Sequence, residues 1–163
     1  MQHNNLNNSG TMTFSKAGLA DGTTTTFTTG TAVDFVIDGV WGTQFGSGGN
    51  QATPTDDYRA GSTFTALATS EGCMFAYGVI AAGSIVIVQG EIEALDSDSN
   101  EWLDGQVPQP PLIPDTMCVF GTRVVKNGST GSAWTLGAGS FDDTGIVSTY
   151  TDVSVMEDRP QVS

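Results

Sequence analysis

The feature that most constrains this chain is a succession of short apolar or threonine-rich segments, each ending at glycine, asparagine or aspartate. Segments of this length that are rich in β-branched and aromatic residues are typical of strands, and closely spaced turn residues favour a sandwich or a barrel. From Thr11 onward the pattern predicts one all-β domain, an antiparallel β-sandwich or a β-barrel-like fold. At most one short helix is expected, because residues 62–70 fit either one or two helical turns or a strand.

The first predicted hairpin lies at residues 31–45. Its first strand has apolar residues at alternate positions and aspartates on the other face, which indicates a half-buried strand. Asp38-Gly39 then favours a type I′ turn, because both central positions of that turn need a positive φ. Glycine, proline and aspartate fill residues 46–61, which are therefore predicted to form a long surface loop.

A second hairpin is predicted with its turn at Ala81-Ala82-Gly83, and its strands are apolar on both faces near the turn. Such strands are expected at the centre of a sheet that is covered on both sides. Asn127-Gly128 is a further turn signal. The predicted strands in this half of the chain are residues 72–80, 84–95, 117–126, 132–136 and 145–156.

The ends of the chain are predicted to lie outside the β domain, which spans residues 11–158. Residues 1–10 are rich in asparagine and nearly devoid of apolar side chains, so we expect a flexible arm, and residues 159–163 form a short tail. The start of the chain lacks a basic segment followed by an apolar run, so no secretory signal is expected. The most apolar stretch, residues 79–88, is far shorter than the roughly 20 residues that a membrane helix needs.

The charge balance disfavours nucleic acid as a partner. The chain has 5 basic and 18 acidic residues, which gives a net charge of −13, and the basic residues are scattered. Binding to phosphates depends on lysine and arginine, and the same reasoning disfavours an anionic membrane surface. The acidity indicates solubility or, alternatively, a cationic partner.

Most catalytic chemistry is also disfavoured, so no enzyme activity and no cofactor are expected. The only histidine is His3, in the predicted arm, which removes histidine-based nucleophilic and zinc sites. No phosphate-binding glycine motif precedes a helix. Cys73 and Cys118 lie in apolar, strand-like segments, where buried free thiols are favoured over a disulfide.

Two acidic patterns in the sequence are candidate sites. Glu91 and Glu93 share a strand face at about 7 Å, the spacing a glycan-degrading carboxylate pair would need, although a solvated face is the simpler interpretation. Asp96, Asp98 and Asn100 have the spacing that begins a calcium loop. The later positions of that motif hold Glu101 and Val107 instead of glycine and a carboxylate, so a polar turn is favoured over a metal site.

Surface aromatic and apolar residues are the remaining candidates, since they anchor protein interfaces or stack on sugars. Trp41 and Trp134 lie in strand-like segments and are predicted to be in the core. Trp102 lies in an acidic segment that leads into a proline-rich stretch, where regular structure is excluded. The candidate partner contacts are Leu6, Trp102, Leu103, Pro110 and Pro111.

The C-terminal two thirds of the chain resembles a group of uncharacterised bacteriophage and prophage virion structural proteins. The likeness is carried by ATPTDD, FTALATSEGCMFAYGV, AAGSIVIVQGEIEALD, PPLIPDTMCVFGTRVVKNGSTGSAW and the closing EDRP. The order and spacing of these segments are moderately specific. None of them is a chemical motif, so the resemblance transfers no functional residue.

The resemblance implies a place in a phage particle. The first expectation is a capsid decoration or cement protein that binds the major capsid protein on the exterior of the head. Such a protein would be a homo-oligomer, with a trimer favoured because cement proteins often occupy three-fold positions. The alternative is a tail or fibre component that contacts other tail proteins and binds host glycans.

Overall fold

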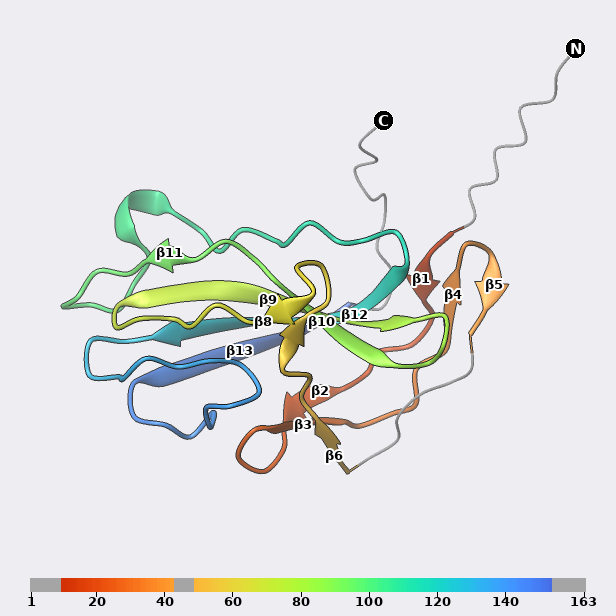
Figure 1. Ribbon diagram of the computed structural model, residues 1–163, viewed down its shortest axis with the longest axis horizontal. Coiled ribbons are helices and arrows are strands. Elements are labelled where there is room, and N and C mark those ends of the chain that lie inside the picture. Colours follow the sequence, from red (N-terminus) through yellow and green to blue (C-terminus); the bar gives the residue numbers. More distant parts are fainter. Residues whose placement is uncertain (1–9, 43–48, 154–163) are drawn as a thin grey trace, which may run out of the picture.

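The computed structural model describes residues 10–42 and 49–153, and these form 13 strands and a single 3-10 turn (Figure 1). The predicted all-β fold is confirmed. None of the helical structure in these ranges is long and apolar enough to cross a membrane. Leu6 and the C-terminal tail, residues 159–163, lie outside the described residues, as does the predicted arm apart from Gly10.

A large central sheet organises the molecule, with the strand order β13-β12-β9-β10-β7-β8 and with β11 paired to β9. All of its pairings are antiparallel except that between β7 and β10. The strands are β7 (Asp56–Asp57), β8 (Ser62–Thr63), β9 (Glu71–Ile80), β10 (Ile85–Gln89), β11 (Glu93–Ala94), β12 (Met117–Asn127) and β13 (Ile146–Asp152).

Two small antiparallel sheets are built mainly from the N-terminal third of the chain. One consists of β1 (Met12–Thr13), β4 (Phe35–Ile37) and β5 (Val40–Trp41). The other consists of β2 (Leu19–Asp21), β3 (Thr26–Thr29) and β6 (Asn50–Ala52). Both contribute buried side chains to the core cluster of the central sheet, so the fold is layered like a sandwich.

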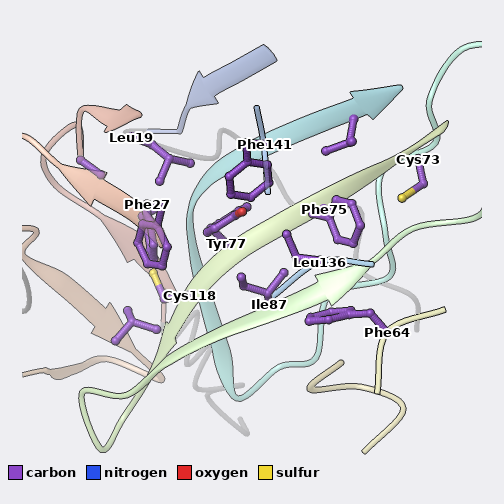
Figure 2. Close-up of a cluster of buried hydrophobic side chains, with 14 of the residues drawn as sticks. Leu19, Phe27, Phe64, Cys73, Phe75, Tyr77, Ile87, Cys118, Leu136 and Phe141 are labelled. Carbon is purple, nitrogen blue, oxygen red and sulfur yellow. The ribbon is translucent and has the colours of Figure 1, made fainter. Parts of the chain in front are cut away.

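The main core lies between these small sheets and one face of the central sheet (Figure 2). Phe27 from β3 meets Tyr77 from β9 edge to face, with ring centroids 5.2 Å apart. Phe64 meets Phe75 in the same way at 5.8 Å. Each buried aromatic side chain of this kind contributes about 1.5–3 kcal/mol of burial free energy, so the rings in β9 anchor both layers.

The opposite face of the central sheet carries a second, smaller core of Ala76, Val88, Met117 and Val119. The proline-rich segment that leads into β12 crosses this face, and its Ile113 packs against the cluster (Figure 1). The prediction that the second hairpin is central and covered on both sides is therefore confirmed.

Both predicted hairpin turns are confirmed. Asp38 and Gly39 have φ values of 51° and 73°, and Ile37 pairs with Val40 across them. Between β9 and β10, Gly83 has a φ of 80°. Glycine, which has no Cβ, and asparagine and aspartate adopt such angles more readily than other residues, so these residue types are informative signals for a turn.

Several predicted segments are wrong. Residues 49–61, the described part of the predicted loop at residues 46–61, are not one long loop, because β6 pairs with β3 and β7 pairs with β10 and β8. The alternative of a strand at residues 62–70 is correct only for the two residues of β8, and no helix forms there. The strand predicted at residues 84–95 is interrupted at Gly90, where a Cβ would lie 2.8 Å from the carbonyl oxygen of Gln109.

Asn127-Gly128 does not start a hairpin to residues 132–136, because the partner of β12 is β13. The side chain of Asn127 is buried instead, and its Nδ2 donates to the carbonyl oxygens of Leu67, Ala68 and Ser132. Asn127, which was expected to form a turn, therefore connects neighbouring loops through the hydrogen bonds of its buried side chain.

Candidate binding surfaces

The most prominent exposed apolar feature is an aromatic patch formed by Phe14 and Trp41. These side chains are 48% and 67% exposed. The rings of Phe14 and Trp41 are stacked, with centroids 4.8 Å apart and planes inclined by 20°. Large apolar side chains that gather on a surface mark interaction sites more often than scattered ones do.

Local structure explains why the aromatic patch is on the outside. The turn at Asp38 and Gly39 ends β4, which is buried, and begins β5, which is exposed. Phe14 follows β1 and its backbone N–H donates to the carbonyl oxygen of Asp34, which holds its ring beside Trp41. The prediction that Trp41 belongs to the core is therefore wrong, because β5 lies outside β4 rather than against the central sheet.

Both ends of the described chain lie near the aromatic patch. Thr13 in β1 donates from Oγ1 to the carbonyl oxygen of Val153 at 2.9 Å, and Gly10 lies two residues before the start of β1. Figure 1 places β1, β4 and β5 together at one end of the molecule. This end therefore combines exposed aromatic rings with the points where residues 1–9 and 154–163 are attached.

The proline-rich segment forms a second candidate surface. Val107 and Leu112 are 58% and 66% exposed, and Leu112 lines a groove of about 520 Å³. The other lining residues are Tyr58, Arg59, Ile113, Pro114 and Thr116.

Of the predicted contacts in this segment, Pro110 is exposed and Leu103 is 37% exposed. Pro111 is buried, so its prediction as a surface contact is wrong. Its ring lies over Gly90, with its Cδ 3.6 Å from where a Cβ would be, because the segment packs onto the central sheet at that glycine.

Trp102 is half-buried and packs onto the central sheet. Its ring covers Gly72, where a Cβ would lie 2.7 Å from Cη2 of the indole. Its backbone forms an isolated bridge with Leu95, and Lys126 Nζ lies 5.5 Å from the ring centroid. Trp134 is 2% exposed, so the prediction that it belongs to the core is confirmed.

The acidic turn at residues 96–100 is organised by its own hydrogen bonds. Asp96 Oδ1 accepts from the backbone N–H of Asp98 and Ser99 and from Ser99 Oγ, and the bonds from Ser99 are the main reason that the pKa of Asp96 is lowered. Asn100 Oδ1 accepts from the backbone N–H of Ser129 instead. Across residues 10–42 and 49–153, no three metal-binding side chains converge.

Glu91 and Glu93 are not held on one strand face, because Gly90–Ile92 lies between β10 and β11. Glu91 is exposed at a shallow depression of about 460 Å³, while Glu93 is half-buried and pairs with Gly72. The nearby Asp57 uses its oxygens to accept backbone N–H groups from Arg59, Ala60 and Gln89. This arrangement is that of a structural turn.

An ion pair made by a buried arginine is the main feature that could not be anticipated from the sequence. Arg123 is 0% exposed, and its Nη2 donates to Asp21 Oδ1 and Ser148 Oγ, both at 2.6 Å. Its guanidinium lies 3.1 Å from the ring centroid of Phe141 and 4.3 Å from that of Tyr150. Tyr150 also donates to Asp21 Oδ1, at 2.7 Å.

The cluster around Arg123 connects the layers of the fold. Asp21 belongs to β2, whereas Arg123 and Tyr150 belong to β12 and β13. Burial raises the pKa of Tyr150 and raises that of Tyr77 to about 12, although the positive charge of Arg123 opposes both shifts. Both tyrosines are therefore neutral at physiological pH, and the cluster joins the two layers through its ion pair and hydrogen bonds.

The two cysteines are buried and free, as predicted. Burial raises the pKa of Cys73 to about 12, which makes it a poor nucleophile. Comparison of the chain with protein-family models, with curated proteins and with solved structures finds no match.

Proposed function

We propose that this chain is a structural component of a bacteriophage particle, specifically a decoration protein that binds the major capsid protein on the outside of the head. The observation that carries the proposal is the aromatic patch of Phe14 and Trp41. Exposed tryptophan is enriched among the residues that dominate protein interfaces, because its large ring gains much burial for little conformational entropy.

The position of the aromatic patch supports this proposal. A shell-binding protein needs a rigid body that presents one end to the lattice, and the stacked rings lie at one end of a layered β structure. Each site on a lattice needs only modest affinity when the copies are also held by neighbours. Segments attached near the patch, including residues 1–10, would then extend over adjacent capsid subunits.

The cations support a protein partner over nucleic acid. Within the described ranges, Arg123 is wholly buried and Lys126 is paired with Glu101 at 2.7 Å. Lys16 and Arg59 are exposed, in a chain with a net charge of −13. Two separated cations cannot neutralise a run of phosphates.

The proposal is tested by rebinding to capsids that lack this protein. We expect Trp41→Ser to weaken binding at least about tenfold, which corresponds to the roughly 1.4 kcal/mol or more that a hot-spot residue supplies. The matched control is Leu112→Ser, which removes an equally exposed apolar side chain (66%) from the other candidate surface.

Occupancy would be measured as copies per capsid by quantitative gel densitometry over a range of protein concentrations. Equal occupancy for Trp41→Ser and wild type would refute the role of the patch, and failure of the wild type to bind any capsid preparation would refute the function. Deletion of residues 1–10 tests the predicted arm. Unchanged occupancy of this variant would show that the arm does not contribute to capsid binding.

The same patch favours one second candidate, a tail or fibre component that binds host glycans. The exposed face of Trp41 offers the flat apolar surface on which sugar rings stack. Immunogold labelling confined to tails, together with glycan binding that Trp41→Ser abolishes, would select this alternative.

A further inference from the structure

The strand β13 is the edge of the central sheet, and it is long for an unprotected edge. It spans seven residues and pairs with β12 on one side. Among the residues that the structure describes, no strand pairs with its other side (Figure 1). An edge of this length presents a row of backbone donors and acceptors that can pair with another chain.

The register identifies which backbone groups point outward. Val153 N–H donates to the carbonyl oxygen of Phe120, and in an antiparallel pair such hydrogen-bonded positions recur at every second residue. Thr149 and Thr151 therefore bond to β12, whereas the N–H and C=O groups of Ser148 and Tyr150 point away from it. Across the described part of the chain, no backbone hydrogen bond involves these four outward groups.

The exposed row of side chains on this edge lacks the usual features that prevent pairing, and Asp152, the one charged residue of β13, accepts from the backbone N–H of Leu19. Val147, Thr149 and Thr151 are exposed in one row, and Val147 is 63% exposed. Natural edges are commonly protected by lysine, proline, a bulge or a very short strand. The opposite edge, β8, is such a short strand, with two residues.

We propose that β13 pairs with β13 of a second copy of this chain, antiparallel and about a two-fold axis at Thr149. In this register Ser148 and Tyr150 of one copy face Tyr150 and Ser148 of the other, so that four outward N–H groups meet four outward C=O groups. Thr149 meets its own counterpart and Val147 meets Thr151.

The sequence of β13 makes a second copy the fitting partner. Threonine and valine pair favourably across strands, and in an antiparallel pairing about Thr149 each outward donor of one copy meets an acceptor of the other. The exposed row carries no charge, and the repulsion between two chains of −13 is screened over about 8 Å at physiological salt. Because the contact is two-fold, it predicts a dimer in place of the expected trimer. The proposed dimer does not depend on the proposed function.

Charge placed on the axis tests the pairing. Thr149→Lys and Thr149→Glu each set like charges directly opposite one another, and both should weaken dimerisation at least about tenfold. Thr63→Lys is the matched control, because Thr63 is also exposed but lies on β8. Sedimentation velocity over a wide concentration range measures the dimer in the absence of capsids. A wild type that stays monomeric, or a dimer or trimer unaffected by both Thr149 variants, would overturn the proposal.

Disulfide trapping tests the register. Two residues on the axis in a non-hydrogen-bonded pair have Cβ atoms about 4.5–5.5 Å apart, near the range a disulfide spans, so Thr149→Cys should form a covalent dimer on mild oxidation. Two copies of Thr151→Cys would be about 13 Å apart, and this variant should remain uncrosslinked. Equal crosslinking of both variants, or of neither, contradicts the proposed axis. The native thiols are buried and serve as the unreacted background.

Discussion

Asp21→Ala is predicted to destabilise the fold by leaving the buried guanidinium of Arg123 without its carboxylate. Removing one partner of a fully buried ion pair costs about 3–5 kcal/mol. The Asp21 side chain is 51% exposed, so solvent already screens part of the pair, and we expect about 2 kcal/mol. Tyr150 loses the acceptor of its hydroxyl in the same variant, which is included in this value.

The effect would be measured by urea unfolding and by thermal denaturation. A loss of about 2 kcal/mol corresponds to a fall in Tm of about 4–8 °C for a chain of this size. Asp98→Ala is the matched control, because it makes the same charge change at an exposed position of the acidic turn, and it should lie within about 0.5 kcal/mol of wild type.

A second substitution separates charge from packing. Adding Arg123→Met to Asp21→Ala should restore part of the lost stability, because the uncompensated charge is removed while the apolar contact with Phe141 is kept. If Asp21→Ala unfolds at the same denaturant concentration as Asp98→Ala, the ion pair does not hold the layers together and the reasoning is refuted.

Three further predictions concern the core and the hairpins. From neutral pH upward, the free energy of unfolding should be constant to about pH 9 and fall between pH 9 and 12, because burial raises the pKa of Cys73 from 9.0 to about 12 and that of Tyr77 from 10.0 to about 12. The folded state thus binds these protons more tightly than the unfolded state does. Each group lowers the free energy of unfolding by up to about 1.4 kcal/mol per pH unit in this range, and Cys73→Ala should move the start of the fall to about pH 10. Gly72→Val should destabilise by about 1–3 kcal/mol in urea unfolding, because a Cβ there meets Trp102 at 2.7 Å. Gly39→Ala should lose about 1 kcal/mol, since φ is 73° at this turn.

Each of these three predictions has a contradicting result. An unfolding free energy that is unchanged at pH 11 would mean that Cys73 and Tyr77 are not shielded from solvent. Wild-type stability of Gly72→Val would mean that Trp102 is not seated on the sheet. Wild-type stability of Gly39→Ala would mean that the hairpin presenting Trp41 adopts another turn.

The strongly patterned elements could be predicted from the sequence. The strands β9, β10 and β12 are rich in apolar and β-branched residues, and the hairpin of β9 and β10 needs the positive φ that Gly83 supplies. The turn at Asp38-Gly39 is similarly local. Such elements are determined by backbone preferences and by burial on both faces, and both leave a signal within a few residues.

Elements that depend on distant partners could not be predicted. The strands β6 and β7 are polar, and they are strands only because β3 and β10 offer open edges to them. Asn127 has the composition of a turn, but three carbonyl groups from two other loops bind its side chain. Tertiary hydrogen bonding overrode the local preference in each case.

The aromatic patch also could not be predicted from local sequence patterns. Trp41 lies in a strand-like segment, and nothing near it in the sequence indicates that β5 lies on the outer side of β4. The burial of Arg123 depends on Asp21, which lies 102 residues away in the chain. A lone arginine among valines in a predicted strand was the one available signal.

The position of this protein on an intact particle tests the account most directly. Immunogold labelling with an antibody against the folded chain would be applied to virions purified from a culture that produces it. We predict label distributed over the outer surface of the head, and label lost when the particles carry Trp41→Ser. Label restricted to the tail, or particles that contain none of the protein, would contradict the assignment to the capsid exterior.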